Sequence, residues 1–129
     1  MIAVDTNIIV RLLARDDEKQ FQKACATFKK EAVFISDTVF LEAEWVLRFA
    51  YNFRPSAINS AFKKLLGLPN VRVANPEILA KAIKWHAAGL DFDNSLHLAK
   101  SQEAVKFLTF DARFIKKSKG LGNCQVERP

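Results

Sequence analysis

The sequence predicts an α/β fold in which helices cover a mostly parallel sheet, and three observations support this. Short apolar runs rich in β-branched and aromatic residues occur at 2–4, 33–35, 71–73 and 107–110, with a last one at 124–126. Helical patterns, with apolar residues three and four positions apart, fill the intervals between these runs. The intervals are too long for tight turns, so successive strands need crossover connections, which produce parallel pairing.

The helical patterns begin at capping or proline signals. In chain order they are the residues after Asp5, 16–31, 37–52, a stretch that opens at Pro55, one from Pro76 to Gly89, one from Asp91 to about Gln102, and a short one after Asp111.

Length and composition limit the classes of protein that the chain can represent. Its 129 residues, half of them hydrophobic, fit one compact domain over residues 1–129. Charged residues interrupt every apolar run, so we expect no membrane span and a cytoplasmic location. The net charge of +6 favours a polyanionic partner. Cys25 and Cys124 sit in no metal-type motif, and we interpret both as ordinary thiols.

Two aspartates stand at the carboxyl ends of predicted strands. Asp5 follows the run that ends at Val4, and Asp111 follows the run that ends at Phe110. Ligands of open α/β sheets bind beyond the carboxyl ends of the strands, so both acids are candidate site residues. Each also precedes a helical pattern, and for Asp5 taken alone a helix N-cap is the stronger interpretation.

Glu42 lies in the helix predicted over 37–52. On that helix its neighbour Glu44 points to the opposite side, whereas Glu42 shares a face with Val39, Trp45, Val46 and Phe49. A carboxylate in an apolar stripe needs a cation, either Lys or Arg or a metal ion. The alternative is a border position from which the carboxylate reaches solvent.

A further polar cluster lies between Gly89 and His97. Asp91 and Asp93 begin a helix there, and their simplest role is to complement the helix dipole. Asn94 falls on a different face from Asp93, because adjacent helical residues point about 100° apart.

Several carboxylates that converge without matching Lys or Arg residues make a site for hard cations such as Mg²⁺ or Mn²⁺. Such ions activate water and neutralise the charge that develops on a phosphate, which suits the hydrolysis of a phosphodiester.

These motifs together resemble the PIN domain, specifically the VapC-type toxins of bacterial toxin–antitoxin pairs. They are Asp5-Thr6-Asn7 after the first strand, Glu42 followed by Trp45-Val46-Leu47, the segment Gly89 to His97, and Thr109-Phe110-Asp111-Ala112-Arg113-Phe114. The resemblance covers nearly the whole chain, and the order and separation of the motifs are its most specific feature.

The resemblance implies a three-layer α/β/α sandwich and a Mg²⁺- or Mn²⁺-dependent endoribonuclease. It also implies a homodimer and a cognate VapB-type antitoxin that covers the active site. Asp5, Glu42 and Asp111 match three of the family's four acidic positions, with Asp5 and Asp111 as metal ligands. Thr6, Asn7 and Thr109 match supporting polar positions.

The fourth position departs from the family pattern, because Asn94 stands where an aspartate is usual. An amide can still donate its oxygen to a metal, so Asn94 stays in the catalytic set with Asp5, Glu42 and Asp111. The amide brings no negative charge, however. Asp91 or Asp93 can compensate in a natural variant, or the substitution is deliberate and attenuates a toxic nuclease.

Two other functions remain open at this point. A PIN-like protein without catalysis would bind RNA or a protein through the same groove, and Asn94 supports this alternative. A phosphotransfer enzyme would use Asp5 as its nucleophile, but the acid that such enzymes usually carry two residues later is absent, and Glu42 would have no task.

Overall fold

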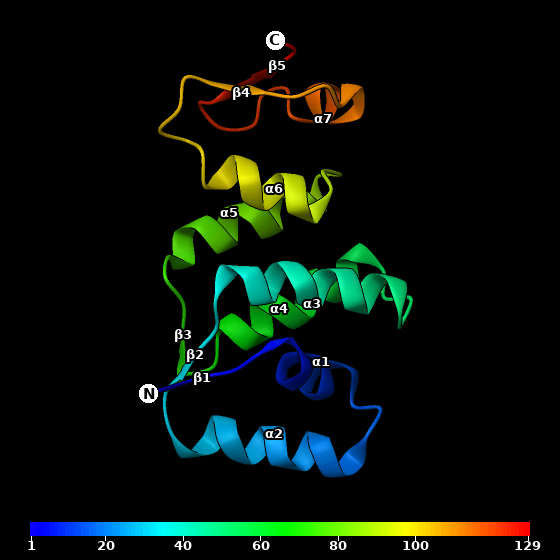
Figure 1. Cartoon of the computed structure of the whole chain (residues 1–129), viewed down its shortest axis with the longest axis vertical. Coiled ribbons are helices and arrows are strands. Elements are labelled where there is room, and N and C mark those ends of the chain that lie inside the picture. Colours follow the sequence, from blue (N-terminus) through cyan, green and yellow to red (C-terminus); the bar gives the residue numbers. More distant parts are fainter. The chain divides into compact units, whose positions relative to one another are not determined.

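The computed structural model describes all residues from 1 to 129, which form two compact units, each shown in Figure 1. The first unit covers residues 1–76 and the second covers residues 77–129. Each combines helices with parallel strands, so the α/β class predicted from the sequence is confirmed. The expectation of a single domain over 1–129 stays a prediction.

The first unit contains a three-stranded parallel sheet in the order β1-β2-β3. The strands are β1 (Ile2–Ala3), β2 (Val33–Phe34) and β3 (Val71–Arg72). Ile2 pairs with Val33, which pairs with Val71 on its other side. Two helices connect each successive pair of strands, which is the crossover geometry that parallel pairing requires.

The four helices of the first unit start at the signals that the sequence provides. They are α1 (Thr6–Ala14), α2 (Glu18–Lys30), α3 (Asp37–Phe49) and α4 (Pro55–Leu66). Asp5, Asp17 and Ser36 cap the first three through side-chain oxygens, and Pro55 begins the fourth. The core includes Phe40 and Phe62, whose rings meet edge to face with centroids 5.2 Å apart.

The second unit contains three helices and two strands. The helices are α5 (Pro76–Ala87), α6 (Phe92–Ala99) and α7 (Ala112–Lys117), and the strands are β4 (Lys106–Leu108) and β5 (Gln125–Glu127). The two strands pair in parallel, with Phe107 opposite Val126. The helix after Asp91 ends at Ala99, earlier than the predicted Gln102, whose side-chain amide donates to the Leu98 carbonyl at 3.0 Å.

Aromatic rings fill the core of the second unit. Phe114 of α7 contacts Phe107 of β4 with centroids 5.3 Å apart, so α7 packs beside the strand that precedes it. Cys124 is buried in this unit, whereas Cys25 on α2 of the first unit is half-buried, and both thiols are free. None of the helices has the length and apolar character that crossing a bilayer requires.

Candidate functional site

Asp5 occupies the turn between β1 and α1, at the carboxyl end of the strand. Its Oδ1 accepts a hydrogen bond from the Ile8 backbone N–H at 3.3 Å, so Asp5 is the N-cap of α1. The side chain is exposed, and its second carboxylate oxygen makes no bond within the chain. The capping role and a metal-binding role therefore use different oxygens of the same carboxylate.

Asp5 also lines a groove between α1 and α2 of about 430 Å³. The polar side chains that line this α1–α2 groove are Asp5, Asn7, Arg11, Gln20, Lys23 and Thr27. Thr6, the other predicted supporting residue beside Asp5, is buried and does not line the groove. Of the two residues after Asp5, only Asn7 is thus available to a ligand in this groove.

Glu42 does not lie in an apolar core stripe of α3, so the predicted core face of this helix was wrong. The alternative position, from which the Glu42 carboxylate reaches solvent, is the one that the structure shows, and Glu44 does point to the opposite side. The buried face of α3 carries Phe40, Ala43, Glu44 and Leu47. Glu42 is exposed, together with Trp45 and Phe49, whose side chains are 58% and 56% exposed. The helix has two apolar stripes, one buried and one exposed. The aromatic residues of the exposed stripe are the reason that the sequence pattern indicated the wrong core face.

Glu44 is the buried acid of α3, and a cation does accompany it. The residue is 2% exposed, and its Oε2 lies 2.8 Å from Nε of Arg48, one helical turn later. The i,i+4 spacing of Glu44 and Arg48 was a sequence signal for this ion pair. Glu42 by contrast makes no hydrogen bond or ion pair, so its carboxylate is available to a ligand.

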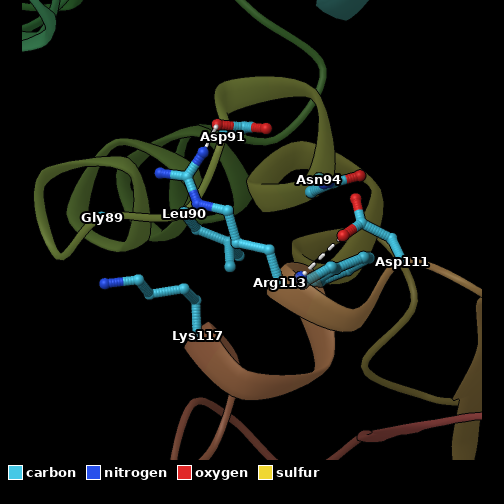
Figure 2. A pocket seen from close by; sticks show the side chains of 8 residues that line it. Gly89, Leu90, Asp91, Asn94, Asp111, Arg113 and Lys117 are labelled. Atoms are coloured by element: carbon cyan, nitrogen blue, oxygen red, sulfur yellow. Dashed lines mark hydrogen bonds and ion pairs between the residues drawn. The ribbon is translucent and has the colours of Figure 1, made fainter.

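The second unit holds Asn94 and Asp111 in one small pocket. Asp111 is the N-cap of α7, and its Oδ1 accepts from the Phe114 backbone N–H at 3.1 Å. Figure 2 shows the Asn94 amide and the Asp111 carboxylate turned toward one another, and both line the pocket. Its interior is about 10 Å³, which is close to the room that one water molecule needs.

Thr109 supports the turn that carries Asp111. Its hydroxyl accepts a hydrogen bond from the Asp111 backbone N–H at 3.1 Å. This contact fixes the peptide from which the Asp111 side chain leaves, as expected of a supporting residue.

The two acids that can compensate for Asn94 differ in position. Asp91 lines the pocket, where its Oδ1 lies 3.6 Å from Nη1 of Arg113 (Figure 2). Asp93 does not line it, and its Oδ1 accepts from the Asn94 backbone N–H at 2.7 Å. Of the two acids, Asp91 is therefore the one placed beside Asn94 and Asp111.

No sequence pattern indicated a polar network that joins α1, the turn after it and the residue Tyr51 beyond the end of α3. The Tyr51 hydroxyl donates to Oδ2 of Asp16 at 2.7 Å, and Nη1 of Arg11 lies 2.9 Å from the same oxygen. The Tyr51 hydrogen bond, followed by Arg11, lowers the pKa of Asp16, while Asp16 raises the pKa of Tyr51. The network fixes the Arg11 side chain at the α1–α2 groove.

The donor chemistry of the candidate residues fits Mg²⁺ or Mn²⁺, which prefer oxygen ligands, because all of them carry carboxylate or amide oxygens. The number of donors does not reach a complete site in either unit. No three His, Cys, Asp or Glu side chains lie close enough together to hold an ion. Asp5 and Glu42 belong to the first unit, Asn94 and Asp111 to the second, and the convergence of all four stays a prediction.

Comparison with known proteins identifies the family. No curated protein matches the chain. The family model described as PIN domain matches residues 2–120, which includes Asp5, Glu42, Asn94 and Asp111. The chain therefore belongs to the PIN domain family, a nuclease family whose members typically depend on a metal ion.

Proposed function

We propose that the chain is a metal-dependent endoribonuclease, the toxin of a toxin–antitoxin pair, attenuated by Asn94. The observation that carries the proposal is the adjacent placement of the Asn94 and Asp111 side chains in one pocket of a PIN domain protein. The positive net charge of +6 supports a nucleic acid as the substrate.

Asp5, Asn94 and Asp111 would hold the metal ion through their oxygens, with Glu42 as the fourth residue of the catalytic set. A Mg²⁺ or Mn²⁺ ion supplies two effects when bound: it lowers the pKa of a water molecule and offsets the charge that develops on the phosphate. The carboxylates of this chain hold and orient the reactants and do not act as nucleophiles.

The attenuation follows from the charge of the second unit's pocket. Asn94 contributes an oxygen without a negative charge, and Asp91 contributes a charge that Arg113 already offsets at 3.6 Å. Metal affinity depends on the charge and number of oxygen ligands. We therefore expect weak metal binding and slow cleavage by the chain as it stands.

The test compares the chain, Asn94→Asp, and Asn94→Asp combined with Asp5→Asn for cleavage of total cellular RNA in Mg²⁺ and in Mn²⁺. Asparagine keeps the capping ability of position 5 and removes its charge. We expect Asn94→Asp to cleave RNA faster and to bind Mn²⁺ about ten-fold more tightly in an electron paramagnetic resonance titration. The double variant should lose both gains, and absence of cleavage by all three folded proteins would refute the ribonuclease function.

The proposal includes a cytoplasmic location, a homodimer and an inhibitory VapB-type antitoxin. Their support is the resemblance of the motifs to VapC-type toxins. The antitoxin is tested by co-expressing this chain with the product of the adjacent gene. Copurification of the two proteins and a growth assay are the measurements. Sedimentation of the purified chain tests the dimer.

A second candidate function is a PIN-like module that binds RNA or a protein without cutting. The Arg113 guanidinium at the pocket favours it, because a nearby cation opposes the binding of a metal ion. This candidate predicts RNA binding that survives in EDTA and no gain of cleavage in Asn94→Asp.

A further inference from the structure

The α1–α2 groove has the size of a ligand site and contains a candidate catalytic residue. Its volume of about 430 Å³ lies within the range of about 300–1,000 Å³ typical of ligand sites. From Gln20 to Thr27 the α2 wall extends over roughly 10 Å, given a rise of about 1.5 Å per residue. That length suits a segment of an extended polymer better than a single small ion.

The polar lining is made almost entirely of hydrogen-bond donors. Asn7, Arg11, Gln20 and Lys23 can donate to a ligand and Asp5 is the one carboxylate, while the Thr27 hydroxyl already donates to the Lys23 carbonyl at 3.0 Å. Phosphate and ribose oxygens accept hydrogen bonds from these residue types in nucleic-acid complexes. The lining therefore matches the sugar-phosphate backbone, with the acid confined to the position proposed to hold the metal.

The contacts within the groove leave several of these donors unused. The Gln20 side-chain oxygen accepts from Nε of Arg11, so its amide N–H₂ group remains available to a ligand. Asp16 and Tyr51 engage Nη1 of Arg11, which holds the guanidinium in place and leaves Nη2 without a partner. Because Asp16 offsets the Arg11 charge at 2.9 Å, Arg11 offers a phosphate a hydrogen bond from Nη2, and Lys23 offers the unpaired charge. Lys23 is exposed and forms no ion pair, so its full charge is available to a phosphate.

A protein helix fits the groove less well than a nucleic-acid strand. Helix binding in grooves relies on apolar anchors. None of the large exposed hydrophobic side chains of the chain lines this groove, and its apolar members Ile8 and Ala24 are half-buried and buried. The exposed aromatic residues Trp45 and Phe49 belong to α3 and lie outside it.

We propose that the α1–α2 groove binds the backbone of single-stranded RNA next to the bond that is cut, with Lys23 and Arg11 as phosphate contacts. This inference rests on the proposed ribonuclease function and adds to it the path of the substrate. An RNA strand in the groove passes Asp5. The contacts that the groove makes with neighbouring nucleotides then hold one phosphate beside the Asp5 carboxylate.

The experiment measures binding of a fluorescent, non-cleavable 2′-O-methyl RNA strand by anisotropy in EDTA, with the full-length chain at several salt concentrations. Lys23→Gln is compared with Lys30→Gln, which removes the same charge from the same helix outside the groove. We expect Lys23→Gln to weaken binding about five- to ten-fold and to reduce the slope of log Kd against log salt by about 0.7. Lys30→Gln should change affinity less than two-fold.

Equal effects of the two substitutions would overturn the groove proposal, because binding would then follow net charge alone. An unchanged RNA affinity, with Lys23→Gln instead releasing a copurifying protein, would overturn it in favour of a protein ligand. Cleavage of RNA in Mn²⁺ by the same proteins, including their Asn94→Asp forms, is scored separately. RNA binding that depends on Lys23 without any cleavage would refute the ribonuclease function and leave the groove as an RNA site.

Discussion

Asp5 and Asp111 have a structural role and a candidate chemical role at the same time. Each caps a helix with one oxygen and exposes the remainder of its carboxylate. Strand-end acids in α/β folds are thus fixed by the backbone that they stabilise. Because the two roles depend on different properties, geometry for the cap and charge for the metal, substitutions can separate them.

Substitutions at Asp5 should separate stability from activity. Asp5→Ala removes the cap of α1 and is expected to lower the free energy of unfolding by about 1 kcal/mol, whereas Asp5→Asn should leave it nearly unchanged. Both should cancel the gain in metal-dependent cleavage that Asn94→Asp provides. Asp17→Ala is the matched control, since Asp17 caps α2 by accepting from the Gln20 N–H at 3.0 Å. It should reproduce the stability loss in urea unfolding and keep the activity; loss of activity in this control would contradict the assignment.

The hydrogen bond from Tyr51 to Asp16 should give stability a defined pH dependence. Asp16 has a pKa lowered below 3.8 in the folded chain, so its contribution is present above about pH 3.8 and is lost as the pH falls through the lowered value. The pKa of Tyr51 is raised above 10.0, so its contribution is present below about pH 10 and is lost as the pH rises through the raised value.

Tyr51→Phe should remove the contribution of the tyrosine and reduce that of Asp16, whose pKa Arg11 continues to lower. The difference in unfolding midpoint between the native chain and this variant should be constant from about pH 5 to 9 and shrink toward either extreme. A carboxyl resonance of Asp16 that titrates at the same pH in both proteins would show that the hydrogen bond does not form in solution.

For individual helices and strands, the sequence predicts where the element begins far better than which face of a helix is buried. Asp5 and Pro55 place the starts of α1 and α4, because capping is a local interaction, whereas α2 begins at Glu18 instead of the predicted 16. The ends of helices are predicted less accurately. The helix predicted to end at residue 52 ends at Phe49, and Asn52 adopts a φ of 56°. The orientation of α3 depends on its tertiary neighbours, and the two apolar stripes around Glu42 and Glu44 make its sequence ambiguous.

The two glutamates of α3 should respond differently to the same substitution. Glu44→Gln or Arg48→Met breaks the ion pair at the buried face and is expected to cost about 1–3 kcal/mol in the free energy of unfolding. Glu42→Gln, at an exposed position, should change it by less than about 0.5 kcal/mol and impair cleavage in the Asn94→Asp background. Urea unfolding and RNA cleavage measure the two effects, and a destabilised Glu42→Gln would mean that the faces of α3 are wrongly assigned.

For the molecule as a whole, the alternation of apolar runs and helical patterns predicted the α/β class. It did not predict the order of the strands in the sheet. The sheet order β1-β2-β3 pairs Ile2 with Val33 and Val33 with Val71, residues that are 31 and 38 positions apart, and no local pattern states which strand neighbours which. The network of Arg11, Asp16 and Tyr51 was not predicted for the same reason: Tyr51 lies 35 residues from Asp16, and no local pattern links residues so far apart. The motifs found by sequence alone nevertheless fell in both units, and the PIN domain match spans both.

The placement of the two cysteines makes the opening of the second unit observable. Cys25, half-buried on α2, is open to an alkylating reagent in the native chain, whereas Cys124, 3% exposed in the second unit, is shielded. Reagents reach a shielded thiol only during local or global opening. The rate at which Cys124 becomes alkylated therefore times the opening of residues 77–129, while Cys25 serves as an internal standard for the reagent. Mass spectrometry can follow the alkylation of both cysteines in the native sequence, with no residue replaced.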